Sequence, residues 1–369
     1  MLRALQVLKS RIELSASAAS LLFVLSSPAA AQEIDTVYLR DGNTETGKVL
    51  EEGWSGLSIQ PERGGKKVIP WGSVQSVDYF DAPEELGNGL ATLAADNAEG
   101  ALELFQAVLG SEGNRPMVVQ QALFYSAFAQ QRIGRGEEAL AAYTKLLGDF
   151  PKGRYLRLAA ENLIDVHLGK PDVAAARAAL DKLAADAKGA EGVEPLLQLL
   201  EARLMEGQGQ HAEARERFAA LEGLAGAPAE MLQEGKLGRA RTLLLDGKGA
   251  EAEPLLRALI AESQSPRVQS GAWNGLGQIQ SSEGRTKKDS ERILEGLYAY
   301  LRTVVQYKPL PGESTEEYER ALNGSAMCFQ YLSELEQNPE RKKLWRERQR
   351  ERLEQLELEY PSSKFLKKK

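Results

Sequence analysis

Cysteine and histidine are almost absent from this chain. Among 369 residues there is one cysteine, Cys328, and there are two histidines, His167 and His211. A single thiol excludes an intrachain disulfide and an all-cysteine metal site. The two histidines lack the H-E-x-x-H spacing that places a zinc ion on a helix. These shortages leave few groups for metal chemistry or for acid–base catalysis.

Sequence motifs of catalysis and cofactor binding are absent too. The sequence holds no G-x-S-x-G nucleophile elbow and no Walker loop. Its most compact glycine pair, Gly64-Gly65, precedes a strand-like segment, whereas a phosphate-binding loop precedes a helix. We therefore expect a non-enzymatic protein without a metal ion or cofactor.

Long hydrophobic runs are absent except near the N-terminus. The apolar run Leu14–Leu25 follows the bases Lys9 and Arg11 and is followed by Ala29-Ala30-Ala31, which offers the small residues that a signal peptidase needs. We predict a signal peptide over residues 1–31. The alternative is a membrane anchor, but the stretch from Leu14 to Ala31 has 18 residues, several of them serines, and is at the short limit for a span. The prediction is a periplasmic or secreted mature chain without an integral membrane span.

The first part of the mature chain has strand-like character. Short β-rich segments alternate with turn signals, of which Asp41-Gly42-Asn43 is the strongest. The five segments are residues 34–39, 47–50, 56–60, 67–71 and 74–79. Short strands at this spacing predict a small closed or nearly closed barrel over residues 32–81. The stretch from Val37 to Gly42, followed by Gly47-Lys48-Val49, resembles the opening of SH3-like and Sm-like barrels.

Sm-like barrels often bind RNA, but the charge of this segment argues against RNA binding here. Residues 32–81 hold nine acids and five bases, so there is no basic patch for phosphates, and we expect no nucleic-acid partner. Trp54 and Trp71 could stack on a sugar. The simpler interpretation is that Trp71 fills the barrel core beside Ile69.

The rest of the chain carries a helical repeat. An alanine followed four residues later by a large side chain recurs at steps of 38, 37, 38 and 38 residues, and a further apolar residue follows at offset seven. The five pairs are Ala101/Phe105, Ala139/Tyr143, Ala176/Leu180, Ala214/Phe218 and Ala252/Leu256. Glycine-containing turns precede most of these helices, which indicates a repeated helix–turn–helix unit.

These units resemble the tetratricopeptide repeat (TPR) family. Trp273-x2-Leu276-Gly277-x2-Gln280 matches the first part of the family pattern with Gln for Tyr, and Ala139-x3-Tyr143 followed by Pro151 matches the second. The resemblance implies an α-solenoid of about seven helical hairpins over residues 84–365. The lysines at the end of the sequence make residues 366–369 a basic tail. An aromatic residue followed by proline occurs twice, as Phe150-Pro151 and as Tyr360-Pro361. Aromatic–proline pairs of this kind are similar to those in TPR proteins of the bacterial envelope. The predicted fold class is α+β, with a β domain and an all-α domain.

In TPR proteins the first helix of each unit lines a concave surface that binds protein segments. The resemblance therefore implies that inward-facing residues contact a protein partner. The candidates are Gln121, Phe124, Phe128, Gln131, Arg203, Glu206, Arg241, Asn274 and Gln278. Phe124 and Phe128 are core residues in the alternative interpretation. Arg203 and Arg241 occupy the same position in adjacent repeats and would either form a ladder for a partner's carboxylates or pair with neighbouring acids.

The last helix is strongly basic. Residues 341–369 carry 11 bases and five acids. A polar cap that keeps the last repeat soluble explains this charge most simply, and a contact with an acidic envelope polymer or a lipid headgroup is the alternative.

Together these patterns predict a non-enzymatic periplasmic scaffold that binds a protein through its concave surface. Two alternatives remain: a glycan- or small-ligand-binding accessory protein that uses Trp54 and Trp71, and a non-catalytic subunit of an envelope enzyme.

Overall fold

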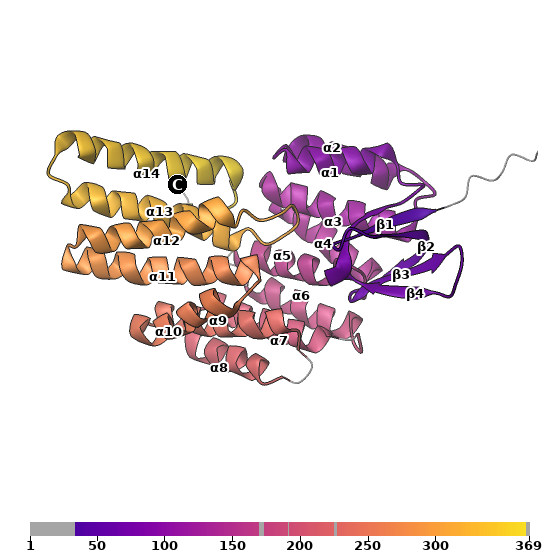
Figure 1. Ribbon diagram of the computed structural model, residues 1–369, viewed down its shortest axis with the longest axis horizontal. Helices are drawn as coiled ribbons and strands as arrows, with labels where there is room; N and C mark the ends of the chain where they lie inside the picture. The colour runs from indigo at the N-terminus through magenta and orange to yellow at the C-terminus, as the bar shows by residue number, and fades with distance from the viewer. Residues whose placement is uncertain (1–33, 170–172, 191, 225–226, 367–369) are drawn as a thin grey trace, which may run out of the picture.

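The computed structural model describes residues 34–169, 173–190, 192–224 and 227–366. The predicted signal peptide and most of the basic tail lie outside these residues. Within them, a five-stranded antiparallel sheet is followed by fourteen helices (Figure 1). No helix in the described residues is both long enough and apolar enough to cross a membrane.

The sheet has the strand order β4-β3-β2-β1-β5. Its strands are β1 (Asp35–Leu39), β2 (Thr44–Glu52), β3 (Gly56–Pro61), β4 (Lys67–Pro70) and β5 (Val74–Asp78). The number of strands agrees with the sequence prediction, but the sheet is open, because no ladder among the described residues joins β4 to β5. β4 is only four residues long and ends at Pro70, which has no N–H to donate to a further ladder.

Helices, rather than barrel closure, cover the apolar face of the sheet. Val37, Val49 and Ile59 are at most 1% exposed and belong to one hydrophobic cluster with Phe105 of α2 and Phe128 of α3. The sheet therefore shares its core with the first helices.

Fourteen helices follow in chain order. The first seven are α1 (Glu84–Ala94), α2 (Ala98–Gly110), α3 (Pro116–Arg132), α4 (Gly136–Asp149), α5 (Leu156–Leu168), α6 (Val173–Asp186) and α7 (Val193–Gly207). The others are α8 (His211–Glu222), α9 (Ala229–Leu245), α10 (Gly249–Glu262), α11 (Pro266–Lys287), α12 (Ser290–Gln306), α13 (Glu316–Leu335) and α14 (Pro339–Glu359). Helices consecutive in sequence pack against one another, as in a solenoid.

The repeat pattern read from the sequence forms the core between these helices. Ala101, Ala139, Ala176, Ala214 and Ala252 are all 0% exposed, and the large residue four positions after each alanine is buried as well. Alanine lets the next helix approach closely, and the large side chain fills the space beside it. The period of about 38 residues thus corresponds to one helical hairpin.

The solenoid curves until its last helices meet its first half. In Figure 1 the helices describe an arc, with α1 and α2 at one end and α13 and α14 at the other. Arg132 of α3 lies 4.7 Å from the centre of the Tyr360 ring, which follows α14. This return brings the start of α13 against the inner face of α5, α7 and α9.

Candidate functional site

The inner face of the solenoid is lined with arginines from successive repeats. Arg157, Arg203, Arg241 and Arg267 come from α5, α7, α9 and α11. Ion pairs join them to buried or half-buried carboxylates. We call this group the inner ionic cluster, and its acids are Glu161, Asp165, Glu206, Glu234, Glu316 and Glu317.

Arg203 and Arg241 bind carboxylates of their own chain. Arg203 pairs with Asp165 and, at 2.9 Å, with Glu316 at the start of α13. Arg241 donates to both oxygens of Glu206 at 2.7 and 2.6 Å and lies 3.2 Å from Glu317. Of the two roles weighed for these arginines, pairing with nearby acids is the one that the structure shows.

The second half of the cluster is centred on Glu161. Its side chain is 0% exposed and accepts from Arg157 at 2.9 Å and from Arg267. Burial alone raises the pKa of Glu161, but the charges of Arg267 and Arg157 outweigh burial and lower that pKa to about 2. Glu161 is therefore ionised at neutral pH and holds two arginines of different repeats together.

The α12–α13 connection (307–315) lies across this inner face. The carbonyl of Gly312 accepts from Asn162 Nδ2 at 3.1 Å, and Ser314 Oγ donates to Asp165 at 2.9 Å. Asn274 Nδ2 donates to the Glu317 carbonyl and side chain, both at 2.8 Å. The chain's own segment therefore occupies the middle of the concave surface that the sequence assigned to a partner.

The other predicted contact residues are buried or half-buried. Phe124 and Phe128 are 0% and 1% exposed, so they are core residues, and Phe124 stacks on Tyr155 at 4.5 Å. Asn274 is 1% exposed, and Gln121 and Gln278 are half-buried. Gln131 accepts from the Tyr143 hydroxyl at 3.0 Å.

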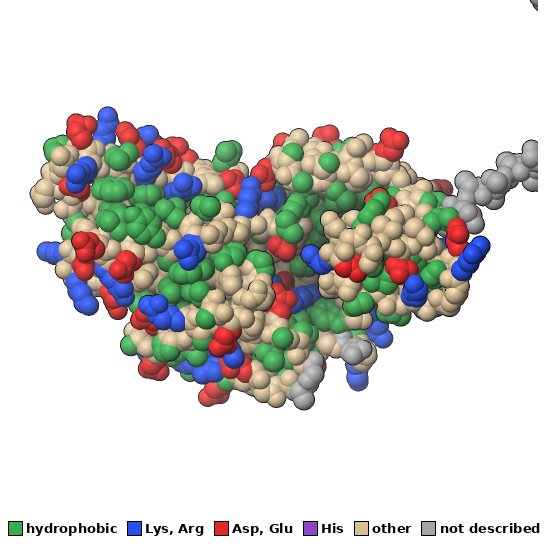
Figure 2. Space-filling model, viewed as in Figure 1, with side chains coloured by type: hydrophobic (Ala, Val, Ile, Leu, Met, Phe, Trp, Pro, Cys, Tyr) green, Lys and Arg blue, Asp and Glu red, His purple; other side chains and the backbone are tan. Residues whose placement is uncertain are grey.

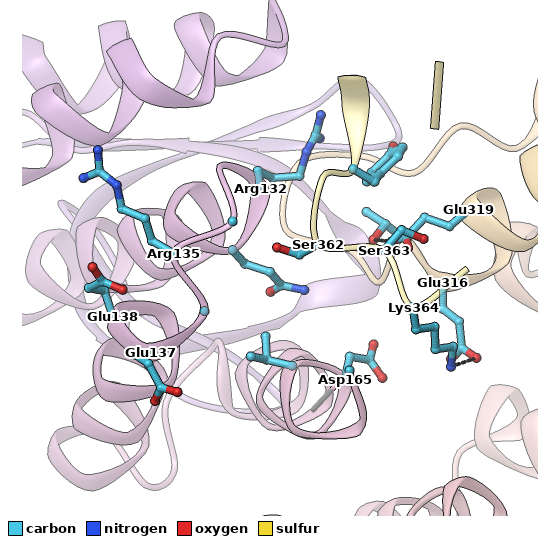
Figure 3. A pocket seen from close by; sticks show the side chains of 17 residues that line it. Arg132, Arg135, Glu137, Glu138, Asp165, Glu316, Glu319, Ser362, Ser363 and Lys364 are labelled. Atoms are coloured by element: carbon cyan, nitrogen blue, oxygen red, sulfur yellow. Dashed lines mark hydrogen bonds and ion pairs between the residues drawn. The ribbon is translucent and has the colours of Figure 1, made fainter. Parts of the chain in front are cut away.

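A cleft of about 550 Å³ opens where the C-terminal segment meets the first half of the solenoid (Figure 3). Its walls come from the α3–α4 turn, the end of α5, the start of α13 and residues 360–364. The charged residues that line it are Arg132, Arg135, Glu137, Glu138, Asp165, Glu316, Glu319 and Lys364. Gln131 is the only member of the predicted set that lines this cleft among the described residues.

The turn between α3 and α4 shapes one side of the cleft. Gly134 has φ +83°, and a Cβ atom there would lie 3.4 Å from Ser362 Oγ. Glycine accommodates both the left-handed backbone and the close approach of the C-terminal segment. On the opposite wall, Lys364 Nζ lies 2.7 Å from Glu316 and fastens the C-terminal segment to α13.

The carboxylates of the cleft are in different electrostatic environments. Burial raises the pKa of Glu319, although hydrogen bonds from Thr315 and Ser363 act in the other direction. Burial and the charge of Glu316 raise the pKa of Asp165, although the charge of Arg203 lowers it. For Glu316, burial is outweighed by Lys364, Arg320 and Arg203, which lower its pKa. The deep wall of the cleft is thus crowded with acids.

The two tryptophans of the β segment join the sheet to the helices. Trp71 Nε1 donates to the Gly53 carbonyl at 2.8 Å, and the Arg154 guanidinium lies 4.2 Å from the Trp71 ring centre. The Trp54 backbone N–H donates to the Lys152 carbonyl at 2.8 Å. Trp71 is half-buried and packs against the cluster that contains Ile69, so it lies beside the core of an open sheet and does not fill a barrel as predicted.

The two histidines and the cysteine lie on three different helices, α5, α8 and α13. His167 is buried in α5, His211 Nδ1 lies 2.9 Å from Asp246, and Cys328 is buried in α13. Nowhere in the described residues do three or more His, Cys, Asp or Glu side chains form a group that could hold a metal ion.

Sequence reasoning missed the residues that close the solenoid. Glu316 and Glu317 look like ordinary acids in the first turn of a helix, where they are favoured by the helix dipole. Their partners, Arg203 and Arg241, are 113 and 76 residues away. One sequence signal pointed to these contacts: Arg203 and Arg241 occupy the same position in adjacent repeats, and such arginines need carboxylates facing them.

No protein-family model matches this chain, and no curated protein matches it in sequence. Among solved structures, it is similar to a tetratricopeptide repeat protein from Parabacteroides merdae ATCC 43184, whose crystal structure was determined at 2.39 Å resolution. The two share 15% sequence identity over 72% of this chain and 98% of that one, with a TM-score of 0.39.

Proposed function

We propose that this chain is a non-catalytic interaction protein that holds a polypeptide segment of a partner in the cleft. The observation that carries the proposal is the opening of about 550 Å³ beside an inner face that the chain itself fills. That volume is within the range of about 300–1,000 Å³ in which ligand pockets fall.

The lining of the cleft suits an extended backbone. Gly134, Gly136 and Gly169 carry no side chains that would cover the main chain at the rim. Ser362 and Ser363 add hydroxyl groups, each of which donates and accepts hydrogen bonds. An extended segment needs such groups because its own N–H and C=O groups must be paired when it leaves water.

The charge of the cleft favours a basic segment. Five acids and three bases line it. Of these bases, Lys364 is paired with Glu316 and Arg132 lies 3.6 Å from Asp96. Asp165 and Glu316 share Arg203, whereas the pKa of Glu319 is raised by burial and by the charges of Glu316 and Asp165. A Lys or Arg side chain of a partner beside Glu319 would therefore favour its ionised form.

Export to the periplasm remains part of the proposal, supported by the sequence of residues 1–31. The glycan-binding alternative loses support because Trp54 and Trp71 are used to join the sheet to the helices.

The test is site-specific photo-crosslinking with a matched control position. Glu138 of α4 lines the cleft, and Glu213 of α8 is exposed on another repeat. Each directly precedes the repeat alanine of its helix, Ala139 or Ala214. With a photoreactive amino acid at position 138 or 213 of the full chain, we expect a polypeptide to crosslink in the producing cells at 138 and not at 213.

The captured polypeptide is then purified and its affinity is measured. We expect Glu138→Lys to weaken binding at least tenfold and Glu213→Lys to leave it unchanged. Equal crosslinking at both positions, or equal effects of the two substitutions, would remove the cleft as the binding site.

A further inference from the structure

Helix α12 presents an apolar stripe to solvent. Leu294, Tyr298, Leu301 and Val305 follow one another at spacings of four, three and four residues, which places them on one face of the helix. Tyr298 is 65% exposed and Val305 is 79% exposed, whereas the two leucines are half-buried. Exposed single apolar residues are common, but here two strongly exposed side chains adjoin two half-buried leucines on one helix face, which gives a connected apolar patch of the kind that marks interaction sites.

The stripe continues into the cluster that joins α12, α13 and α14. Leu294 and Leu301 pack against this cluster, and so does Trp345 of α14, whose ring stacks on Phe329 with 5.9 Å between ring centres. In Figure 2, hydrophobic side chains gather over α12 and α13. The apolar surface therefore extends from α12 toward α14.

Basic side chains border this surface. Residues 341–352 of α14 contain seven bases and two acids, Glu347 and Glu351. Figure 2 shows Lys and Arg side chains along α14 beside the apolar surface. Pairing within the helix links Lys343 to Glu347, Arg348 to Glu351 and Arg350 to Glu354 but leaves a surplus of positive charge.

Helix stability does not account for these bases. The N-terminal end of a helix carries partial positive charge, so bases in the first turns of α14 oppose the helix dipole. Arg341, Lys342 and Lys343 lie in those turns, directly after the cap residue Asn338 and Glu340. A polar cap on the last repeat accounts for polar side chains here but not for an excess of one sign, whereas an acidic partner accounts for that sign.

We propose that the α12 stripe and the basic half of α14 dock an amphipathic helix of a partner protein whose apolar face is flanked by Asp or Glu. The apolar residues of such a helix would cover Tyr298 and Val305, and its acids would face the bases of α14, which would favour and orient the encounter. A second copy of this chain fits less well, because a two-fold contact between identical surfaces would bring two basic borders together. The docking surface is distinct from the cleft.

A designed peptide tests this proposal on the full chain. The probe is an 18-residue helical peptide with leucines at spacings of three and four and glutamates on both flanks, and its binding is measured by fluorescence anisotropy. The reference peptides are a scrambled sequence of the same composition and a version with Lys in place of Glu. We expect the glutamate peptide to bind at least tenfold more tightly than either reference, and less tightly as salt is raised.

Two double variants locate the site. We expect Tyr298→Ser with Val305→Ser to weaken binding at least tenfold, and Arg341→Glu with Arg346→Glu to weaken it at least tenfold at low salt. The matched control, Val68→Ser with Leu245→Ser, changes two exposed apolar residues elsewhere and should have no effect.

Four results would overturn the proposal. Equal binding of the scrambled peptide would reduce the effect to unspecific charge attraction, and no binding of any peptide would exclude this occupant. Co-flotation with vesicles containing phosphatidylglycerol that is lost in the Tyr298→Ser, Val305→Ser variant would assign the surface to lipid. A dimer in sedimentation equilibrium that is lost in the same variant would assign it to a second copy.

Discussion

Arg203 Nη2 lies 2.9 Å from Glu316 Oε2, although 113 residues separate the two in sequence. The pair joins α7 in the middle of the solenoid to the first residue of α13. Because Arg203 also binds Asp165 of α5, one guanidinium connects three helices. The curvature of the repeat array is therefore fixed at its inner face by ionic contacts between distant repeats.

Removal of the Arg203 guanidinium should destabilise the fold strongly. Arg203 is 5% exposed, and Arg203→Ala leaves the side chains of Asp165 and Glu316, which are only 16% and 14% exposed, without this counter-ion. We expect the free energy of unfolding to fall by about 3–5 kcal/mol, measured by urea denaturation. Arg177→Ala is the control, because Arg177 is 49% exposed in its pairs with Asp181 and, at 3.6 Å, with Glu201, and its loss should cost no more than about 1 kcal/mol. Equal losses would contradict a fixing role for Arg203.

Gly312 should tolerate no side chain at the inner face. Its φ is +93°, and a Cβ atom would lie 2.6 Å from Phe124 Cε1. We expect Gly312→Ala to lower the free energy of unfolding by about 1–2 kcal/mol from the backbone and by a further ~1–3 kcal/mol from overpacking. Gly113 has φ +85° and no atom within 4 Å of the position of a Cβ, so Gly113→Ala should show the backbone cost alone. A similar loss in both variants would indicate that the α12–α13 connection is not packed on Phe124.

Glu161 should make the fold sensitive to acid. Its pKa is about 2 in the folded protein and near 4.5 in the unfolded chain. A lowered folded-state pKa gives stability that is present above about pH 4.5 and is lost as the pH falls toward 2. We expect Glu161→Gln to lose on the order of 3 kcal/mol relative to wild type at pH 6, and the gap to narrow as the pH is lowered. Free energies of unfolding at pH 6, 4 and 3 measure this trend, and a constant gap would contradict it.

Glu52 should show the opposite pH dependence. Burial raises its pKa, although the charge of Arg154 and a hydrogen bond from Tyr79 act against burial. A raised carboxyl pKa means that this group's contribution to stability declines as the pH rises above about 4.5. We therefore expect Glu52→Gln to gain stability relative to wild type between pH 4 and pH 7, in the same denaturation series. A relative loss over that interval would show that the ion pair with Arg154 outweighs burial.

Cys328 should be unreactive in the folded protein. The side chain is 0% exposed, and burial raises the pKa of its thiol to about 12. The thiolate is the reactive form, so we expect a disulfide reagent at pH 8 to modify folded protein at least 100-fold more slowly than protein in urea. Rapid labelling of the folded chain, at the rate seen in urea, would show that α13 does not stay packed between α12 and α14.

The sequence by itself determined the local architecture. The alanines at steps of about 38 residues, each followed by a large residue, encode helical hairpins, because spacings of four and seven place residues on one helix face. Alternating β-rich segments and turn residues likewise encode the five strands. The export signal is also a matter of local sequence, and it stays a prediction.

Only the tertiary structure decided where the solenoid meets itself. Small rotations between repeats add up over fourteen helices, and no local pattern specifies their sum. That sum brings Glu316 and Glu317 to Arg203 and Arg241, buries Phe124 under Gly312 and opens the cleft beside Ser362. The open sheet is also a result of tertiary packing. Helices α1 to α3 cover its apolar face, which barrel closure would otherwise have to bury.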